Sequence, residues 1–568
     1  MRTIFAACTP RDEVIKGELK EQEFAASLTK VLRGTAEPVY QDPATFFANT
    51  YPTEGLKSLL AEALGRLTGK APAGAPVIRL ETSFGGGKTH NLIALYHICR
   101  AKLSPRQIEG FVAADLLPCQ PIEKIAGIVG PDMDPASGVD HGDARTFTLW
   151  GEIAYQLGGK AGYEVVRSSD EQRTAPGTQV WEKIIGDDPA LIMIDEAAYY
   201  LRVARGTQLG ATNLADQATA FLMSLMKFVA ESKRAVLVYT LTESTDAFGR
   251  EADELRQEMA EARSISARQE HVLTPTRGEN EISAIVAHRL FAKVDKSAAE
   301  ETASGFGESY RKWMDQKVDL PQRAVQAEYR AEIVANYPFH PELLITLNRK
   351  TSTIPNFQKT RGMLRLLALT IRDLWSRKPK DCYLVSLHDL NLGMEAVAND
   401  FTSRLNRPQF KQVIEADIVS PSGQDPSHAQ QIDAELIEAG RPPYARRIAT
   451  AAFIHSLVQV GQSGADPADL RLAVLQPGDD PALVDKALQR LVDKGWFFDY
   501  DGLRYRFKTE PSLRKIVEDE MNLVGEVKAK TATSSAATST ARGSATSGSS
   551  LSPTTSAPKP RTPASGWR

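Results

Sequence analysis

Short apolar runs recur along the first half of the chain, and polar residues follow each one. They lie at residues 77–80, 122–129, 190–194, 235–241 and 272–273. Such runs are typical of strands buried on both faces of a parallel sheet. Stretches with helical spacing lie between them. The pattern therefore predicts an α/β domain with a parallel-sheet core at residues 71–278.

Helical spacing dominates on both sides of this predicted core. Residues 1–70 are expected to form an N-terminal helical segment, and residues 279–400 a helical lid. Near the end of the chain the composition shifts to Ser, Thr, Ala, Gly and Pro, and residues 527–568 contain no acidic side chain. Such a segment has too few apolar residues to form a core, so a disordered tail is expected there.

A further small domain is predicted at residues 441–520, after a proline-broken linker with short helices at 401–440. Three helices are expected, at 445–460, 467–475 and 481–494. A hairpin that turns at Asp501 and Gly502 follows them. Three helices and a two-stranded hairpin in this order predict a winged helix.

The predicted hairpin alternates apolar and basic residues. Three positions are expected to face the core: Leu503, Tyr505 and Phe507. The positions between and beyond them carry cations that could contact DNA phosphates: Arg504, Arg506 and Lys508. The third helix, however, exposes mixed charges that would read bases poorly. DNA contact and protein contact both remain open for this domain.

A glycine-rich loop joins the first predicted strand to a helix at residues 91–100. It reads Thr82-Ser83-Phe84-Gly85-Gly86-Gly87-Lys88-Thr89, with His90 next. The loop matches the phosphate-binding pattern GxxxxGK[ST] (Walker A), except that Thr82 replaces the first glycine. Glycines let backbone N–H groups point at an anion at a helix N-terminus. Residues 82–90 are therefore the predicted nucleotide-binding loop, with a chance glycine-rich turn as the alternative.

Within this loop, Lys88 is predicted to reach the β- and γ-phosphates and Thr89 to ligate Mg²⁺. Two carboxylates follow the apolar run at 190–194, namely Asp195 and Glu196. They would lie at the carboxyl edge of the sheet, where ligands bind in open α/β folds. Asp195 is predicted to hold Mg²⁺ and Glu196 to polarise the attacking water. The two halves together indicate ATP, or GTP as the alternative, with Mg²⁺ as the cofactor.

Further residues are candidates for sensing the γ-phosphate. Thr242, with Thr240 as the alternative, ends the strand at 235–241. Arg263 or Arg268 precedes the last core strand, where ring-forming ATPases present an arginine finger to a neighbouring subunit. A solvated helix end is the equally open alternative for these arginines. Arg365 follows Gly362 near the start of a lid helix, from which it could contact the γ-phosphate.

The overall composition adds mostly exclusions. The chain has 568 residues with a net charge of −3, so no global positive field attracts it to nucleic acid. Its four cysteines are scattered, which argues against a zinc site or a disulfide framework. No apolar run approaches the roughly 20 residues of a membrane span. A cytoplasmic protein without membrane contact is expected.

Taken in order, these elements look like those of an AAA+ ATPase of the additional-strand P-loop type with a helical lid and a winged helix. Four segments more closely resemble the family called domain of unknown function 499: residues 42–53, 81–97, 192–202 and 358–368. That family has Thr at the first loop position. Its members are predicted AAA+ ATPases, often encoded beside DNA methylases and helicases in phage-defence or restriction islands. The resemblance implies a DNA-linked role, with methylases or helicases as partners.

The sequence as a whole predicts an enzyme that hydrolyses ATP to drive a conformational change, acting on DNA or on a DNA-bound partner in a defence or restriction-modification system. A homo-oligomer is among the expected assemblies. Two other functions remain open. One is a non-motor switch or scaffold that binds ATP with little turnover, and the other is a DNA-binding regulator whose winged helix is gated by ATP.

Overall fold

The computed structural model describes residues 1–17, 26–70, 74–81, 87–241, 253, 270–275, 278–351, 359–422, 424–457, 463–513, 516–517, 520–521 and 524–525. Residues Met1–Thr509 form one compact unit and Glu510–Arg568 a second. The described residues of the second unit include short helical stretches with exposed side chains, such as Leu513 at 82% exposure. The tail predicted at 527–568 lies outside the described residues.

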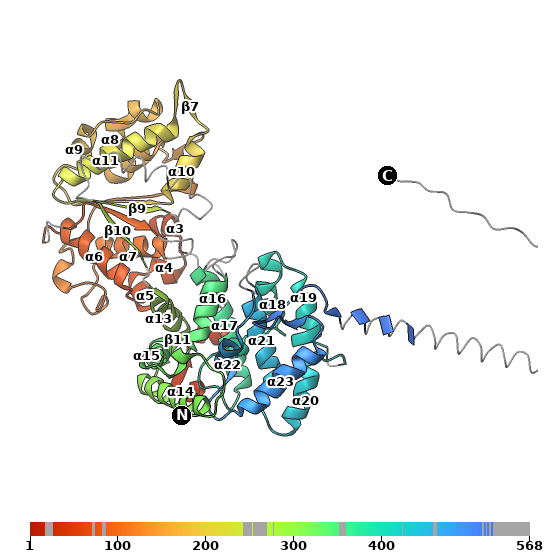
Figure 1. Ribbon diagram of the computed structural model, residues 1–568. Helices are drawn as coiled ribbons and strands as arrows, with labels where there is room; N and C mark the ends of the chain where they lie inside the picture. The colour runs from red at the N-terminus through yellow and green to blue at the C-terminus, as the bar shows by residue number, and fades with distance from the viewer. Residues whose placement is uncertain are drawn as a thin grey trace, which may run out of the picture. The chain divides into compact units, whose positions relative to one another are not determined.

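A five-stranded parallel sheet forms the centre of the first half of the chain (Figure 1). Its strands are β2 (Val77–Glu81), β3 (Lys124–Val129), β6 (Ala190–Asp195), β9 (Ala235–Leu241) and β10 (Glu270–Leu273). They lie in the order β10-β2-β9-β6-β3. The predicted α/β core is thus confirmed, and β9 lies between β2 and β6. All neighbours are parallel, so the carboxyl ends of β2, β6 and β9 meet at one edge.

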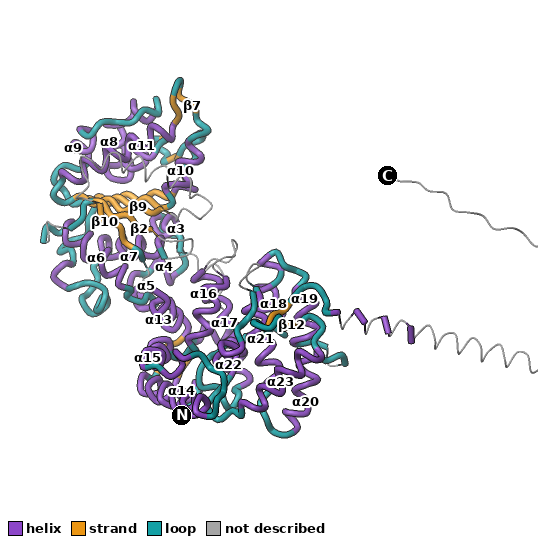
Figure 2. The backbone as a smooth tube through the Cα atoms, viewed as in Figure 1, coloured by secondary structure: helices purple, strands orange, loops and turns teal. Residues whose placement is uncertain are grey.

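Alternate residues of each central strand contribute to different hydrophobic clusters. In β6, Leu191 and Met193 join one cluster, whereas Ile192 and Ile194 join the other. Helices cover both faces of the sheet (Figure 2). One face is covered by α8 (Leu149–Glu171), α9 (Gln179–Ile184), α10 (Ala197–Ala204) and α11 (Leu214–Glu231). The opposite face is covered by α3 (Leu28–Leu32), α5 (Pro43–Ala48), α6 (Glu54–Leu67) and α7 (Lys88–Arg100).

The predicted single helical segment at 1–70 is wrong, because the structure divides it between two cores. Strand β1 (Cys8–Pro10) pairs with β11 (Phe291–Val294) in the helical half, and helix α2 (Asp12–Lys16) contacts α17 (Lys359–Arg377). The later helices α3 to α6 cover the sheet instead. Helical spacing reveals an apolar face but not which core that face joins.

The helical half begins with α13 (Gly278–Leu290), α14 (Lys296–Asp315), α15 (Ala327–Asn336), α16 (Pro341–Thr351), α17 and α18 (Glu395–Phe401). Residues 401–440 contain short helices, as predicted, but these helices pack into the core and do not form a linker. These residues form α19 (Phe410–Val413), a π-helical turn (Ile414–Ile418) and α20 (His428–Glu438). Val413, Ile414 and Ile432 are buried in the same hydrophobic cluster as α14 to α17. The prolines interrupt the helical pattern of this stretch, but its apolar residues still pack into the hydrophobic cluster.

The elements predicted after residue 440 are present in the expected order. Helices α21 (Tyr444–Ser456), α22 (Pro467–Val474) and α23 (Pro481–Lys494) precede a hairpin of β12 (Phe498–Tyr500) and β13 (Tyr505–Phe507). These elements share the hydrophobic cluster of the lid helices, so they do not form the separate domain that was predicted. Phe507 is buried as expected, but Leu503 is 76% exposed, because it lies in the turn beyond the paired residues.

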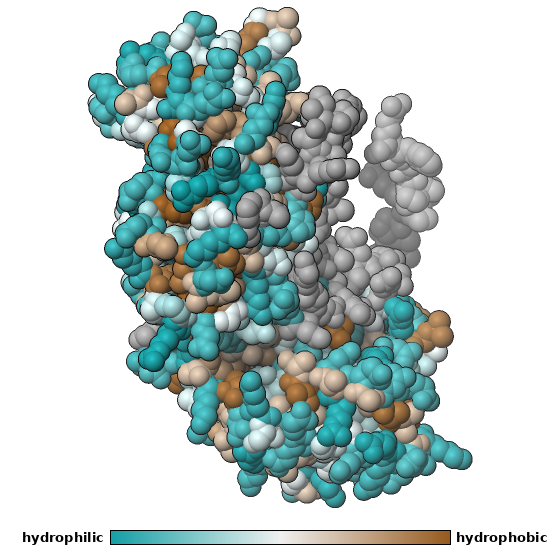
Figure 3. Space-filling view, turned by 90° about the vertical axis from the view of Figure 1, so that its left-hand side faces the viewer, coloured by the Kyte–Doolittle hydropathy of each residue, from teal (hydrophilic) through white to brown (hydrophobic). Residues whose placement is uncertain are grey.

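The surface drawn in Figure 3 is mainly hydrophilic, with apolar residues scattered across it. The large apolar side chains lie mostly in the three hydrophobic clusters. No helix in the described part of the chain is long and apolar enough to cross a membrane.

Candidate functional site

Helix α7 begins at the glycine-rich loop and carries two of the predicted site residues. Gly87 is its N-cap, with φ 88° and ψ 9°, a left-handed conformation that glycine adopts without a Cβ clash. Lys88 follows in the first turn and is only 8% exposed. The predicted binding residues Thr82, Ser83, Phe84, Gly85 and Gly86 lie outside the described residues. The described part of the loop therefore consists of its final glycine and the start of the helix.

Asp195 brings the two halves of the predicted site together. It ends β6, is 2% exposed and accepts two hydrogen bonds from hydroxyl groups. Thr89, from the first turn of α7, donates to Asp195 Oδ2 at 2.6 Å. Thr240, from β9, donates to Asp195 Oδ1 at 2.7 Å. Both carboxylate oxygens are thus held in place from neighbouring elements.

Glu196 is held by its backbone in an unusual conformation. Its φ of 54° and ψ of 44° are left-handed, which costs a non-glycine residue roughly 1–2 kcal/mol. Its N–H donates to the Thr240 hydroxyl at 2.9 Å. A Cβ placed on Gly130 would lie 2.3 Å from the Glu196 carbonyl oxygen, so only glycine fits beside it. Thr240 of β9 and Gly130 at the end of β3 thus hold the Glu196 backbone in this strained conformation.

The electrostatics of the site act mainly on this glutamate. Burial, and next the negative charge of Asp195, raise the pKa of Glu196 to about 7. Lys88 opposes the rise, and Asp132 adds to it. A carboxyl group with a pKa near neutrality can take a proton from water and release it again.

Asp132 is a site residue that sequence reasoning missed. It lies in a short 3₁₀ helix (Gly130–Asp132) directly after β3, and its carboxylate accepts a hydrogen bond from Thr29. Because β3 and β6 are parallel neighbours, a carboxylate after either strand reaches the same sheet edge. An acidic residue three positions beyond the run at 122–129 was the available signal.

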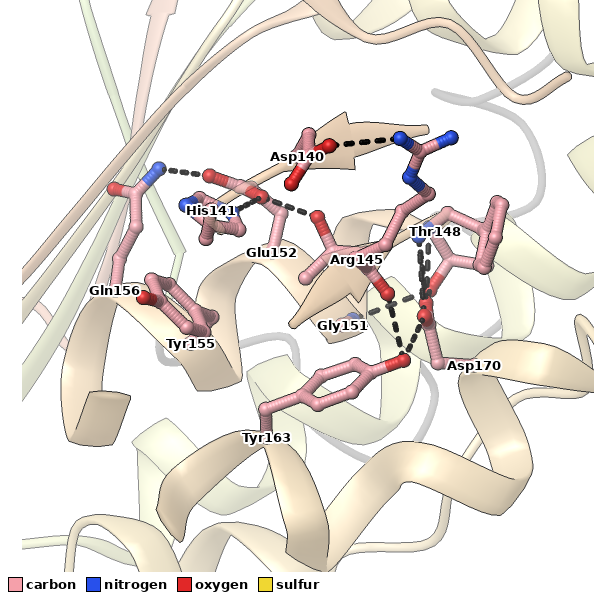
Figure 4. Close-up of polar contacts among 12 residues, drawn as sticks. Asp140, His141, Arg145, Thr148, Gly151, Glu152, Tyr155, Gln156, Tyr163 and Asp170 are labelled. Carbon is pink, nitrogen blue, oxygen red and sulfur yellow. Dashed lines mark hydrogen bonds and ion pairs between the residues drawn. The ribbon is translucent and has the colours of Figure 1, made fainter. Parts of the chain in front are cut away.

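A polar cluster anchors the chain that continues from Asp132 (Figure 4). Asp170 near the end of α8 accepts hydrogen bonds from the Phe147 and Thr148 N–H groups, each at 3.0 Å. Glu152 accepts a hydrogen bond from the Thr146 hydroxyl. Its Oε2 atom lies 2.8 Å from Nε2 of the His141 ring. These contacts tie the hairpin of β4 (Val139–Asp140) and β5 (Arg145–Thr146) to α8.

His90 was predicted as part of the nucleotide-binding loop, and the structure directs its side chain toward the N-terminal helices. Its ring stacks on Phe46, with centroids 4.5 Å apart, and its Nε2 lies 2.9 Å from the Thr50 hydroxyl. Burial, followed by the charge of Arg289, lowers the pKa of His90 to about 3. The ring is therefore neutral and packed, which leaves the backbone N–H for any contact with phosphate.

The predicted arginine sensors are described only in part. Arg365 Nη2 forms an ion pair with Asp400 Oδ1 at 2.9 Å, within the helical half. Arg263, Arg268 and Thr242 lie outside the described residues. Thr240, the alternative to Thr242, is the strand residue that contacts both Asp195 and the Glu196 backbone.

The residues at the sheet edge fit a magnesium–polyphosphate ligand. Mg²⁺ prefers hard oxygen ligands and takes one or two from the protein, the rest coming from phosphate and water. The Thr89 hydroxyl and the Asp195 carboxylate, 2.6 Å apart, are oxygens of this kind. Lys88 and the start of α7 supply positive charge beside them. The arrangement can bind a polyphosphate and activate a water molecule with Glu196.

Comparisons with known proteins agree with the division of the chain. The model of the DUF499 N-terminal domain matches residues 5–274, and that of the DUF499 second domain matches residues 277–474. No curated protein matches the chain. Among solved structures, the Aeropyrum pernix ORC2 protein in its ADPNP–ADP complexes is similar at 12% identity and a TM-score of 0.28. That match covers 87% of this chain and 98% of the other. The two domain models together span most of the sequence, and the chain therefore belongs to the DUF499 family.

Proposed function

We propose that the chain is an ATPase that binds ATP with Mg²⁺ at the carboxyl edge of the parallel sheet and hydrolyses it. The observation that carries the proposal is the convergence on Asp195 of Thr89 from α7 and Thr240 from β9. The position of β9 between β2 and β6 supports an additional-strand P-loop core of the AAA+ type. No other described site combines a phosphate-loop lysine with an aligned pair of carboxylates.

Each residue has a distinct role in this proposal. Lys88 and the N–H groups at the start of α7 bind the β- and γ-phosphates. Thr89 and Asp195 hold Mg²⁺, which neutralises charge on the phosphates when bound. Glu196 accepts the proton of a water molecule whose oxygen attacks the γ-phosphorus, and the bond to the β–γ bridging oxygen breaks. Thr240 positions both carboxylate-bearing residues, since its hydroxyl contacts each of them.

A short chain of contacts connects α7 to the helical half. His90 of α7 contacts Phe46 and Thr50. The same segment contacts α13, because His288 Nε2 lies 3.0 Å from the Ala48 carbonyl oxygen. Movement of α7 with the nucleotide state would therefore act on α13 through residues 46–50. This chain of contacts supports a motor or a switch that changes the arrangement of the helical half.

The arginine roles depend on the assembly. Arg365 would act as a lid sensor by exchanging Asp400 for the γ-phosphate. Arg263 or Arg268 would serve a neighbouring subunit as a finger in a homo-oligomer. Loss of turnover with retained ATP binding in an Arg365→Ala variant would support the sensor role.

We further propose that α21 to β13 form a winged helix, acting in a DNA-linked complex such as a defence or modification system with methylase or helicase partners. An antiparallel bridge between Ala465 and Tyr505 adds a third strand position to the hairpin, as this topology requires. Arg506 lies 3.2 Å from Asp501, and Arg490 of α23 pairs with Glu435 at 2.8 Å. These internal ion pairs reduce the positive field, which favours a protein partner over base reading by this unit.

The decisive experiment measures steady-state ATP hydrolysis by wild type, Lys88→Ala and Glu196→Gln, each with and without duplex and single-stranded DNA. We expect Lys88→Ala to lose ATP binding and Glu196→Gln to bind ATP without turnover. Stimulation by DNA supports a DNA-acting ATPase. Slow turnover that DNA leaves unchanged identifies a switch. Full activity of Lys88→Ala would overturn the proposed site.

A further inference from the structure

Strand β3 ends beside the proposed base, and the sheet supports it on one side. It is the last strand in the order β10-β2-β9-β6-β3, with β6 as its neighbour in the described sheet. Two residues directly after β3 act on Glu196, namely Gly130 and Asp132. The outer row of backbone N–H and C=O groups of an edge strand has no partner strand. The position of β3 therefore depends on what contacts its free side.

A glutamine side chain of α8 contacts that free side. The N–H of Gly127, in the middle of β3, donates to Gln156 Oε1 at 2.8 Å. Both residues line a cleft of about 720 Å³ at this edge of the sheet. The amide oxygen of Gln156 thus takes the place of a carbonyl from a further strand. Without it, the Gly127 N–H would be open to the cleft.

The amide of Gln156 is itself held at its other end. Its Nε2 donates to Glu152 Oε1 at 2.8 Å, one turn earlier in α8. Glu152 is only 5% exposed, and its Oε2 accepts the Thr146 hydroxyl and lies 2.8 Å from Nε2 of His141. Because the amide nitrogen faces a carboxylate, the amide oxygen faces Gly127. Figure 4 shows the line of side chains from Gln156 through Glu152 to the hairpin of β4 and β5.

The fixed point at Gly127 lies three residues before Gly130. The Glu196 carbonyl oxygen is so close to Gly130 that a Cβ there would lie 2.3 Å from it. A shift of β3 would therefore act on the strained Glu196 backbone, and it would also move Asp132. Misplacing a reacting group by about 1 Å can reduce a rate about 100-fold, even when the cause lies far from the chemistry.

We propose that Gln156 is a positioning residue for Glu196. Its amide holds the free edge of β3, and β3 in turn holds Gly130 against the Glu196 backbone. Gln156 contacts neither the nucleotide nor the attacking water in this role. The inference rests on the proposed function, because the group that Gln156 positions is the proposed base.

The test compares Gln156→Met with the wild type in the full chain, by steady-state ATP hydrolysis across neutral pH. Methionine has a similar length but offers Gly127 only a weak sulfur acceptor. We expect kcat to fall about tenfold and KM for ATP to change by less than about twofold, because Lys88 and α7 are untouched. The pH midpoint of kcat should fall as well. A displaced β3 relieves the burial of Glu196 and removes the charge of Asp132, both of which raise the Glu196 pKa.

Two further variants separate positioning from a general loss of stability. Gln172→Met is the matched control, because Gln172 is an exposed glutamine at the end of the same helix that donates to the Ser168 hydroxyl at 3.2 Å. The double variant Glu152→Gln/Gln156→Glu exchanges the two side chains, so an acceptor still faces Gly127 and an amide–carboxylate pair remains. We expect wild-type kinetics from the control and recovery of most of the lost kcat in the exchange variant. Thermal unfolding shows that each variant is folded.

An unchanged pH midpoint in Gln156→Met, with or without a fall in kcat, would overturn the proposal, since loosening of the fold alone does not act on the pKa of Glu196. An exchange variant as slow as Gln156→Met would do so too. In either case an active wild type leaves the proposed function intact. A wild type without ATP hydrolysis, or full activity of Glu196→Gln, would overturn the proposed function and this inference together.

Discussion

The sheet edge and the surroundings of Arg447 in the helical half bury charge in opposite ways. At the sheet edge, Glu196 is buried beside the like charges of Asp195 and Asp132, with Lys88 opposing them. In the helical half, Arg447 is buried beside the opposite charges of Asp381, Asp389 and Asp479. Burial, and next the charge of Asp195, raises the pKa of Glu196 to about 7. Arg447 remains charged, because Asp381 and Asp479 raise its pKa despite the opposing effect of burial.

This difference separates a group suited to proton transfer from a group suited to a permanent ion pair. A group that must accept and release a proton needs a pKa near the working pH, which like charges and burial provide. A group that only holds an anion needs a charge that never titrates, which arginine provides. The comparison predicts that substitutions at the sheet edge act on turnover, whereas substitution of Arg447 acts on stability.

The largest effect is expected from Glu196→Gln. The amide keeps the shape of the side chain but accepts no proton, so kcat should fall by about 10²–10⁴-fold while ATP binding persists. Steady-state hydrolysis and equilibrium ATP binding measure the two quantities. Glu164→Gln is the control, because Glu164 is an exposed glutamate of α8, 41% accessible. Equal loss in both variants would contradict a base role for Glu196.

On the other side of the comparison, Arg447→Met should lower the free energy of unfolding by about 3 kcal/mol. Met fills much of the same space but leaves Asp381 and Asp479 without their buried cation. Denaturant unfolding of the full chain measures the change. A loss of less than about 1 kcal/mol would mean that the pair is weak, as for surface ion pairs.

Thr240→Val tests the role of Thr240 at the sheet edge, and we expect it to reduce turnover about tenfold. Valine keeps the shape of threonine but removes the hydroxyl that contacts Asp195 and the Glu196 N–H, leaving buried polar groups without a partner. The measurement is kcat together with thermal stability. Thr219→Val serves as the control, since Thr219 is buried on α11 and donates to the Ala215 carbonyl, at 3.0 Å. Similar turnover in both variants would remove Thr240 from the site.

The smallest effect concerns pH. The folded-state pKa of Glu196 is about 7, above its usual 4.5, so the folded protein holds this proton more tightly than the unfolded chain. Ionising Glu196 therefore reduces stability as pH rises from about 4.5 to 7, and the cost is complete above that range. Glu196→Gln should raise the Tm by a few degrees at pH 8, and the difference should shrink at pH 5. A difference independent of pH would contradict the raised pKa.

The turnover number should also depend on the ionisation of Glu196, but it should rise with pH where stability falls. The ionised form of Glu196 is the active base, so wild-type kcat should rise with pH through about 7 and then level off. The residual activity of Glu196→Gln should lack this step. A wild-type profile that is flat between pH 6 and pH 8 would argue that another group accepts the proton.

Local patterns in the sequence were enough to predict the strands of the five-stranded sheet, the phosphate-loop helix and the pair of acidic residues at the end of β6. An apolar run that must be buried on both faces specifies a strand. A glycine before Lys88 specifies the start of α7 by backbone conformation alone. These features depend on a few consecutive residues, and the sequence therefore contains them directly.

Contacts between distant segments required the tertiary structure. Ile194 lies opposite Tyr239, and this register brings Thr240 level with Asp195, 45 residues away in the chain. The pairing of β3 with β6 likewise places Asp132 at the site. The pairing of β1 with β11 places residues 8–10 in the helical half. The ion pair of Arg447 with Asp381 joins α21 to the chain after α17, which no spacing connects. The sequence by itself determined which local structures form, and packing alone decided which charges meet, because burial and register depend on the whole chain.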